Sequence, residues 1–365
     1  MRNIQFLIKP SSSLCNMNCK YCFYHDEAKN REQASFGLMT ESTIDALLQK
    51  VFASSYDQVS LMFQGGEPTL VGLDFFRFVT EKVKEYNKQS IRVDYAIQTN
   101  GLNITEEWAK FFAKHRFLVG ISLDGTKQIH NLNRIDNNGE ETHKRIMHSI
   151  EILKKEKVPF NILSVVTKSF ARHIDSAWRF FMDNGIDYLQ FIPCLDPIGC
   201  ERGKEKYSLT PKEYGEFLKK TFDYWYNAIM CNKYVYVRYF DELLFLVTGA
   251  GCPSCSMSGR CVNQLVVEAD GSVYPCDFYV LDEYKIGNIL TDSIEDLKNK
   301  GDNSSFVTQS DRYKNACAEC KWYGLCRGGC RRDYENVQNY FCESFKVFFE
   351  YAYERLMLLA RQLGR

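Results

Sequence analysis

The sequence predicts an α/β protein: a partial (β/α)6 barrel, similar to a TIM barrel, followed by a cysteine-rich domain. Strand-like apolar runs alternate with amphipathic helical patterns through the first half of the chain, and this alternation is typical of parallel sheets with right-handed crossovers. Short polar or glycine-rich motifs follow the strands. After about Val235 the alternation stops and cysteines become dense. We therefore expect domains at residues 1–235 and 236–365.

Six strands are expected in the first domain, from their apolar β-type composition. They lie at Ile4–Ile8, Gln58–Phe63, Val93–Gln98, Leu118–Leu123, Phe160–Val166 and Tyr188–Ile192. Helices are expected between them where apolar residues recur with helical spacing. Their approximate ranges are Thr40–Phe52, Leu73–Lys88, Thr105–Lys114, Glu141–Lys157 and Ala171–Asn184. Six such strand–helix units would form a partial barrel.

The motifs after the strands should meet at one rim, because parallel strands of a barrel all end on the same side. In chain order they are Cys15-x3-Cys19-x2-Cys22, Gln-Gly-Gly-Glu-Pro at 64–68, Gln-Thr-Asn-Gly at 98–101, Ser-Leu-Asp-Gly at 122–125 and Pro-Cys-Leu at 193–195. Each motif is weak alone. Their common placement predicts an active site at this rim.

The second domain is expected to be organised more by metal than by a large core. A hairpin is indicated around Gln264–Tyr274, with Ala269-Asp-Gly271 as its turn. The segment Glu343–Gln362 reads as an amphipathic helix whose aromatic and leucine positions face a core.

Composition indicates a cytoplasmic protein without nucleic-acid or membrane partners. Lys plus Arg and Asp plus Glu number 46 each among 365 residues, so no overall field draws the chain to polyanions. The N-terminal residues 1–19 hold too short an apolar run for a signal peptide, and no apolar stretch approaches the ~18 residues of a membrane span.

Fifteen cysteines are best explained by metal ligation, because disulfides are rare in the reducing cytosol. In C-x3-C-x2-C, Cys15, Cys19 and Cys22 can hold three irons of a 4Fe–4S cluster and leave the fourth iron open. An open iron can bind a small molecule and pass it an electron, so the triplet indicates catalysis.

The cysteines of the second domain supply eight further candidate ligands, enough for two complete four-iron clusters. They are Cys255, Cys261, Cys276, Cys317, Cys320, Cys326, Cys330 and Cys342. Structural zinc is the alternative, since C-x2-C is also half of a zinc site. Cys252 competes almost equally with Cys255, and we interpret Cys194, Cys200 and Cys231 as buried small hydrophobes.

With these motifs in view, Cys15-x3-Cys19-x2-Cys22-Phe-Tyr and Gly-Gly-Glu-Pro resemble the radical S-adenosylmethionine superfamily. The C-terminal cysteines resemble its SPASM extension, which carries two auxiliary four-iron clusters. The chain is most similar to the anaerobic sulfatase-maturating enzymes, in the segments 63–70, 98–101, 120–125, 191–197, 271–277 and 325–330.

The resemblance implies oxidation of a cysteine or serine to Cα-formylglycine, within a Cys/Ser-x-Pro-x-Arg motif of an unfolded or nascent sulfatase. It implies S-adenosylmethionine and three 4Fe–4S clusters as cofactors, and an external electron donor such as flavodoxin or ferredoxin. Which cysteine closes which auxiliary cluster stays open. Another radical peptide modifier, forming thioether or carbon–carbon crosslinks, is the nearest alternative; an electron-relay protein and a zinc scaffold are more distant ones.

Cofactor-binding roles follow from the same resemblance. Gly65, Gly66, Glu67 and Pro68 would line the methionine amine, although an ordinary strand-to-helix turn would look the same. Ser122 would bind the ribose, and Arg134 would pair with the methionine carboxylate unless it is a solvated loop arginine. Tyr21 and Leu195 would flank the adenine, or simply pack.

Three residues are candidates for handling the peptide. Gln64 and Tyr24 would hold it near the radical, with core packing as the alternative for Tyr24. Asp277 directly follows Cys276 and is the candidate base, with a pKa raised by the negative charge of nearby clusters. The alternative for Asp277 is a hydrogen-bonded turn residue.

Overall fold

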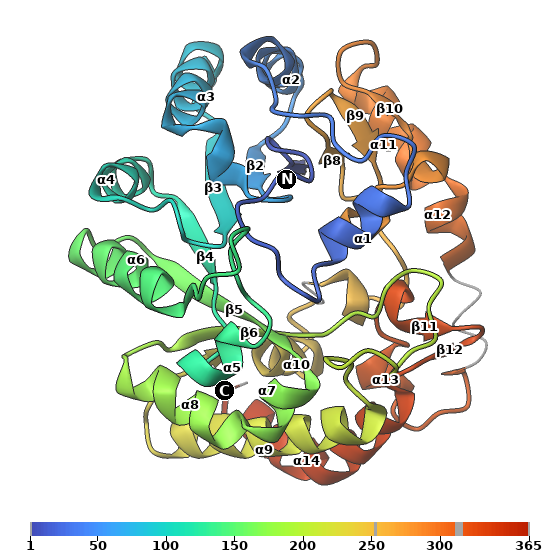
Figure 1. Ribbon diagram of the computed structural model, residues 1–365. Coiled ribbons are helices and arrows are strands. Elements are labelled where there is room, and N and C mark those ends of the chain that lie inside the picture. The colour runs from blue at the N-terminus through green and yellow to red at the C-terminus, as the bar shows by residue number, and fades with distance from the viewer. Residues whose placement is uncertain (1, 252–253, 311–316, 364–365) are drawn as a thin grey trace. The chain divides into compact units, whose positions relative to one another are not determined.

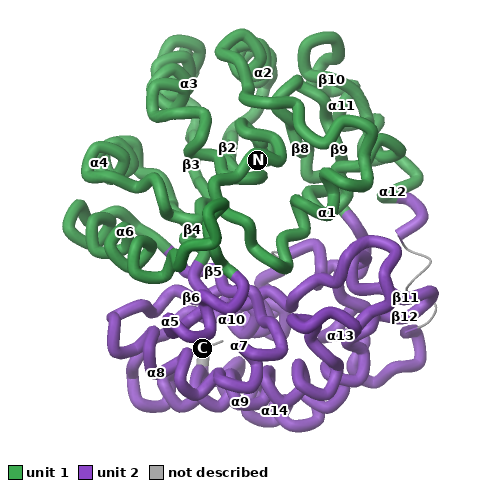
Figure 2. Tube along the Cα trace, viewed as in Figure 1, with its two compact units in different colours: residues 1–122, 134–160, 262–307 green, residues 123–133, 161–261, 308–365 purple. Residues whose placement is uncertain are grey.

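The computed structural model describes residues 2–251, 254–310 and 317–363. It contains two compact units that interleave along the chain (Figure 2). Unit 1 comprises residues 1–122, 134–160 and 262–307, and unit 2 comprises 123–133, 161–261 and 308–365. The predicted boundary at 235 and 236 falls inside unit 2 and stays a prediction. Cys252 lies outside the described residues.

Four parallel strands form the centre of unit 1, and all four were predicted. They are β1 (Asn3–Ile8), β2 (Gln58–Phe63), β3 (Arg92–Thr99) and β4 (Leu118–Ser122). Phe63 pairs with Ile8 on one side and Ile97 on the other, and Ile97 also pairs with Val119. All four side chains are buried. This register places the ends of the strands, and therefore the loops that follow them, at the same edge.

The predicted hairpin also belongs to this sheet. In β8 (Val266–Val267), Val266 pairs in parallel with Leu7 of β1. The antiparallel strands β9 (Ser272–Tyr274) and β10 (Gly287–Asn288) follow. The order in unit 1 is β10-β9-β8-β1-β2-β3-β4. A segment from the cysteine-rich half of the chain thus extends the sheet that the N-terminal strand begins.

The predicted helices of unit 1 are confirmed, and Figure 1 shows them along one face of its strands. They are α2 (Glu41–Ala53), α3 (Leu73–Tyr86), α4 (Glu106–His115) and α6 (His143–Lys155). Thr40 and Thr105 cap α2 and α4 by accepting hydrogen bonds from backbone N–H groups. The remaining helical segments are α1 (Phe23–Lys29), η1 (Pro68–Val71), η3 (Asp277–Tyr279), η4 (Asp282–Tyr284), α11 (Ile294–Asp302) and α12 (Ser305–Thr308), the last ending at the first residue of a unit 2 segment.

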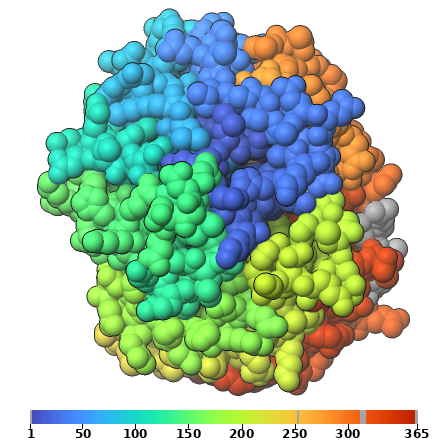
Figure 3. All heavy atoms as spheres, in the orientation of Figure 1, coloured from blue at the N-terminus to red at the C-terminus, as the bar shows by residue number. Residues whose placement is uncertain are grey.

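Early and late parts of unit 1 lie side by side on the face shown in Figure 3, where blue residues adjoin orange ones. The Nζ of Lys50 donates to the carbonyl of Ile289 at 2.5 Å, and the N–H of Glu32 donates to Asp282 Oδ2 at 2.7 Å. These contacts attach the hairpin segment to helix α2 and to the loop between α1 and α2.

Unit 2 has three parallel strands in the order β5-β6-β7: β5 (Phe160–Val166, in this unit from Asn161), β6 (Tyr188–Pro193) and the unpredicted β7 (Tyr236–Val237). The single helix expected at 171–184 is instead two, α7 (Lys168–Arg172) and α8 (Ile174–Asp183), because His173 leaves the helical conformation. The other elements are α5 (Lys127–Asn131), α9 (Pro211–Met230), α10 (Arg238–Val247), η2 (Cys255–Met257), α13 (Tyr323–Cys326), η6 (Arg331–Asp333), β11 (Tyr334–Glu335), β12 (Gln338–Asn339) and α14 (Cys342–Leu363).

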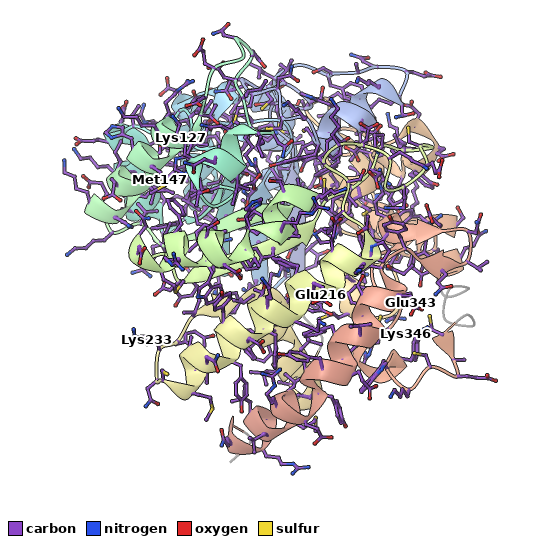
Figure 4. All side chains as sticks on the ribbon, turned by 60° about the horizontal axis from the view of Figure 1, so that its bottom comes forward. Lys127, Met147, Glu216, Lys233, Glu343 and Lys346 are labelled. Atoms are coloured by element: carbon purple, nitrogen blue, oxygen red, sulfur yellow. The ribbon has the colours of Figure 1, made fainter. Side chains whose placement is uncertain are left out.

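The core of unit 2 is built on α9 and α14, which run side by side in Figure 4. The ring of Phe222 on α9 contacts the rings of Phe240 and Phe348 at centroid distances of 5.5 and 5.7 Å. On α14 the buried apolar residues are Phe345, Phe348, Phe349, Ala352, Leu356, Leu359 and Ala360. The predicted core-facing stripe of this helix is confirmed. No helix of the described part of the chain combines the length and apolarity of a membrane span.

Candidate active site

The cysteine triplet lies in the loop between β1 and α1, and its chemistry fits a metal cluster. Cys15, Cys19 and Cys22 are half-buried. Cys15 Sγ accepts hydrogen bonds from the Met17 N–H at 3.4 Å and from Asn100 Nδ2 at 3.6 Å. Cys22 precedes the first turn of α1, whose N–H groups favour its thiolate. Donors that stabilise negative charge on sulfur suit a cluster ligand.

Burial acts against these donors as long as the thiols are free. It raises the pKa of Cys15 to about 12, with Glu67 contributing in the same direction, and it raises the pKa of Cys22. Thiols of this kind lose their protons when a metal binds, so cluster assembly and deprotonation are linked.

The Gly-Gly-Glu-Pro loop packs directly beneath the cysteine loop. The N–H of Gly66 donates to the Ser12 carbonyl at 2.8 Å, and the N–H of Glu67 donates to the Leu14 carbonyl at 2.7 Å. A Cβ on Gly66 would lie 2.1 Å from the Leu14 oxygen, and Gly65 has a φ of 115°. Both glycines are therefore required by the close approach of two backbones. Their contact with the methionine amine stays a prediction.

The Glu67 side chain joins this loop to the Gln-Thr-Asn-Gly motif. Its buried carboxylate accepts from Thr69 N–H, Thr69 Oγ1, Thr99 Oγ1 and Asn100 N–H at 2.6–3.0 Å. Three of these bonds end at Oε1 and one at Oε2, so Oε2 keeps an acceptor site, and the contact of Glu67 with the methionine amine stays a prediction. Pro68 begins η1 directly afterwards.

Arg134 lies against Tyr21, which is itself part of the cysteine loop. The Arg134 guanidinium carbon lies 5.4 Å from the centroid of the Tyr21 ring, and its charge favours the thiolate of Cys22. Arg134 is 5% exposed, so the alternative of a solvated loop arginine is wrong. Ser122 ends β4, where its Oγ accepts from Gln98 Nε2 at 3.2 Å. Leu195 is half-buried in unit 2, in the loop after β6.

Tyr24, Gln64 and Asp277 form one buried hydrogen-bonded network in unit 1. The Tyr24 hydroxyl donates to Asp277 Oδ2 at 2.7 Å, and Gln64 Nε2 donates to the same oxygen at 2.9 Å and to the Tyr24 hydroxyl at 2.7 Å. Asp277 Oδ1 is buried and has no hydrogen-bond partner among the described residues. Three residues predicted separately, from α1, the loop after β2 and η3, thus meet at one carboxylate.

Burial raises the pKa of Asp277, while the charge of Lys9 and the hydrogen bond from Tyr24 lower it. The raised pKa was expected from cluster charge; in the structure, burial is its largest cause.

Behind this network lies a buried ion cluster that sequence reasoning missed. We define it as Lys9, Glu27, Arg31 and Glu268. Lys9 Nζ lies 3.1 Å from Glu268 Oε1 and 3.6 Å from Glu27 Oε2, and Arg31 lies 2.8 Å from Glu268 Oε1. One signal was available in the sequence: Lys9 directly follows the apolar run Ile4–Ile8, a position where a buried charge could have been expected.

The cysteines of unit 2 fall into two groups by their mutual electrostatic effects. Cys330 interacts with Cys255 and Cys261, while the second group consists of Cys317, Cys320, Cys326 and Cys342. Burial raises the pKa of Cys261 to about 11 and that of Cys326 to about 12. Cys276 lies in unit 1. The sequence did not decide which cysteine belongs to which auxiliary cluster. The two groups suggest one assignment of these cysteines.

The three cysteines that were not proposed as cluster ligands differ in burial, whereas all three were expected to be buried. Cys194 is buried as expected, but Cys200 and Cys231 are exposed, so their interpretation as buried hydrophobes is wrong. Cys231 follows the last turn of α9, and Cys200 lies in a turn after β6, where surface loops leave side chains in water.

No three His, Cys, Asp or Glu side chains converge on a single-ion site within residues 2–251, 254–310 and 317–363. A four-iron cluster carries each thiolate on a different iron, so its ligands need not converge as those of zinc do.

Two family models match the chain. The radical SAM superfamily covers residues 10–172, and an iron–sulfur cluster-binding domain, SPASM, covers 255–321.

Curated relatives match over the whole length. The chain is 48% identical to the cysteine-type anaerobic sulfatase-maturating enzyme of Clostridium novyi, covering 100% of this chain and 99% of that one. Identity is 44% to the cysteine-type enzyme of Clostridium perfringens, with both chains covered fully. It is 28% to the serine-type enzyme of Bacteroides thetaiotaomicron, covering 98% and 91%.

Solved structures agree. A structure described as native anSMEcpe with bound AdoMet and Cp18Cys peptide matches with a TM-score of 0.93 at 44% identity, over 99% of both chains. SuiB of Streptococcus suis, bound to the precursor peptide SuiA, has a TM-score of 0.64 at 17% identity, over 94% of this chain and 76% of that one, and shows the fold alone. The expected partial barrel with a SPASM domain is confirmed.

Proposed function

The chain belongs to the cysteine-type anaerobic sulfatase-maturating enzymes of the radical SAM superfamily, and from this premise we propose that it oxidises a sulfatase cysteine to Cα-formylglycine. The target lies in a Cys-x-Pro-x-Arg motif. The full-length identity of 44–48% to cysteine-type enzymes, against 28% to a serine-type one, carries this proposal. A cysteine is therefore the proposed target, with serine the less favoured substrate.

The enzyme uses S-adenosylmethionine and three 4Fe–4S clusters. Bound at the protein, these cofactors supply the radical that takes a hydrogen atom from Cβ of the target residue, and a route for the second electron. Cys15, Cys19 and Cys22 would hold the cluster with the open iron. Cys255, Cys261 and Cys330 would help to hold a second cluster, and Cys317, Cys320, Cys326 and Cys342 would hold a third. Cys276 is a further candidate ligand.

The protein's own residues have two roles in the reaction: they remove a proton from the target, and they hold the reacting group. Tyr24 and Gln64 bind Asp277 through Oδ2, so Oδ1 is left to accept the thiol proton of the target. Burial raises the pKa of this carboxyl, which brings a base closer to the operating pH. After loss of the hydrogen atom, the proton and one electron, the target is a thioaldehyde, which water converts to the aldehyde with release of hydrogen sulfide.

Several further assignments rest on the chemistry of the cofactors. Arg134 would pair with the methionine carboxylate, Ser122 with the ribose, and Tyr21 and Leu195 with the adenine. A small one-electron carrier such as flavodoxin or ferredoxin would reduce the first cluster. We place the reaction in the cytoplasm, where unfolded sulfatase chains and a reducing environment are both present.

The test of the activity is anaerobic reaction with a Cys-x-Pro-x-Arg peptide and its serine counterpart, following peptide mass and 5′-deoxyadenosine together. The expected product has lost sulfur and gained an aldehyde. A product that has lost only hydrogens would instead identify a crosslinking enzyme, and absence of 5′-deoxyadenosine would contradict radical chemistry.

Asp277→Asn tests the base. Formylglycine should fall by about a hundredfold or more, the usual contribution of a general base, while 5′-deoxyadenosine still forms. Glu283→Gln changes an exposed carboxylate in η4; this variant is the matched control and should keep its yield. Near-normal yield from Asp277→Asn would rule out Asp277 as the essential base.

A further inference from the structure

Lys9 is a fully buried lysine at the end of β1, and none of the roles above uses it. Its side chain is 1% exposed, and its ammonium faces two carboxyl groups, Glu268 at 3.1 Å and Glu27 at 3.6 Å. Burying an ammonium is costly unless it is paired and hydrogen-bonded, so its position is tightly determined.

The same ammonium also reaches the proposed base through Tyr24. Lys9 Nζ lies 4.9 Å from the centroid of the Tyr24 ring, within the range of a cation–π contact. The hydroxyl of that ring donates to Asp277 Oδ2 at 2.7 Å. Lys9 also attracts the Asp277 carboxylate directly. One buried cation therefore acts on both the donor and the acceptor of this hydrogen bond.

Arg31 is the second cation of the ion cluster, but its contacts lead elsewhere. It bonds Glu268 Oε1 at 2.8 Å, Ser12 Oγ at 3.1 Å and the Ala34 carbonyl at 2.8 Å, and it stacks on Phe36 at 5.2 Å. Both cations balance Glu268, so removal of either disturbs the charge of the cluster. Lys9 adds the contact with Tyr24.

We propose that Lys9 is a positioning residue for the oxidation: its buried ammonium holds the Tyr24 ring, and through the Tyr24 hydroxyl it orients the Asp277 carboxylate. This inference rests on the proposed role of Asp277 as the base. Without the ammonium, Tyr24 loses the charge beneath its ring, and Asp277 Oδ2 loses a fixed donor. Removal of the hydrogen atom from the target cysteine would continue at its usual rate, but removal of its thiol proton would become slower.

The test compares Lys9→Met with Arg31→Met in the cluster-loaded enzyme. The ratio of 5′-deoxyadenosine to formylglycine should rise at least about tenfold in Lys9→Met, as expected when a base is misplaced. It should change less than about twofold in Arg31→Met. Iron content and affinity for the target peptide, measured without reductant, should stay as in the parent. Equal ratios in the two variants would overturn the proposal, because loss of buried charge alone would then explain the effect.

A double-mutant cycle separates this inference from the base assignment. If Lys9 acts through Asp277, adding Lys9→Met to Asp277→Asn should lower the formylglycine yield less than about twofold further, because coupled residues are not additive. A full further loss would overturn the inference while leaving the base assignment standing. A normal yield from Asp277→Asn alone would instead overturn the base assignment.

Two more variants keep the test valid if Lys9→Met does not fold. Lys9→Met/Glu268→Gln removes one buried charge of each sign and should show the same raised ratio. Lys9→Arg keeps the cation and should restore the ratio to within about threefold of the parent, in line with a positional role. A normal ratio in the charge-balanced double variant would overturn the proposal.

Discussion

Glu27 is a buried carboxyl group whose proton is held more tightly in the folded chain than in water. The residue is 2% exposed; its Oε1 accepts from the Val280 N–H at 3.1 Å, and its Oε2 lies 3.6 Å from Lys9 Nζ. Burial raises the pKa of Glu27 to about 8, against the opposing charge of Lys9. The folded state therefore binds this proton across a range in which the unfolded state has released it.

The resulting pH dependence has a definite sign. A folded pKa above the unfolded value means that Glu27 favours folding most at low pH, and that this contribution is lost as pH rises from about 4.5 to about 8. The free energy of unfolding should fall by up to about 1.4 kcal/mol per pH unit in this window. Thermal unfolding midpoints at pH 6 and pH 8, measured anaerobically, check this.

Glu27→Gln should flatten that dependence, because an amide does not titrate. The exposed Glu283→Gln is the matched control and should keep the slope of the parent. An unchanged slope in Glu27→Gln would assign the effect to another group.

Residues of the site were predictable where they belong to motifs, and unpredictable where they only balance charge. Tyr24, Gln64 and Asp277 stand beside cysteines or glycines whose spacing marked them. Arg31 and Glu268 meet across 237 positions, and in a sequence a buried lysine or glutamate looks the same as a solvated one. Their pairing depends on the fold, which no local pattern records.

Among the elements, α14 couples cluster ligation to the core of unit 2. The helix begins at Cys342, a proposed cluster ligand, and six residues later Phe348 packs against Phe222 and Phe240. The packing of this helix against the core therefore fixes the position of Cys342, its first residue.

Phe348→Ala should destabilise unit 2 by about 3–5 kcal/mol, the usual cost of deleting a buried phenylalanine. Val347 is 46% exposed, and Val347→Ala should change stability by less than about 0.5 kcal/mol. Unfolding midpoints of the two variants give the comparison. Similar midpoints would show that the contact of α14 with the core contributes little.

Long elements were predictable from periodicity, and very short ones were not. The strands β1 to β6 and helices α2, α3, α4 and α6 carry enough residues to show an apolar repeat. Strands such as β7 and β10 have two residues each, too few for alternation. Their pairing is set by the neighbouring strand: Tyr188 and Leu189 of β6, for example, pair with Tyr236 and Val237 of β7.

For the whole molecule, the cysteine groups predict a pattern of iron loss. Cys326→Ala should lower iron from about twelve to about eight atoms per chain, because each cluster holds four. Cys231 is exposed and outside both groups, so Cys231→Ala should retain the full content. Anaerobic iron and sulfide analysis provides the measurement. Loss of all iron from Cys326→Ala, or zinc in its place, would contradict independent four-iron sites.

The architecture of the two halves was predicted, but their interleaving was not. Strand and motif order indicated the barrel, and cysteine density indicated the second region. That residues 262–307 belong with the N-terminal strands follows from sheet pairing between Val266 and Leu7, a contact between distant positions that leaves no trace in local composition.

This pairing also has a consequence for biosynthesis. Strand β1 leaves the ribosome early, while β8, which completes its other edge, is made only when most of the chain exists. Cys276 and Asp277 follow within the same stretch. A prematurely terminated chain therefore carries the three cysteines proposed to hold the first cluster, but neither strand β8 nor the carboxylate proposed as the base. Translation thus separates the residues proposed to bind the first cluster from the carboxylate proposed as the base by most of the chain.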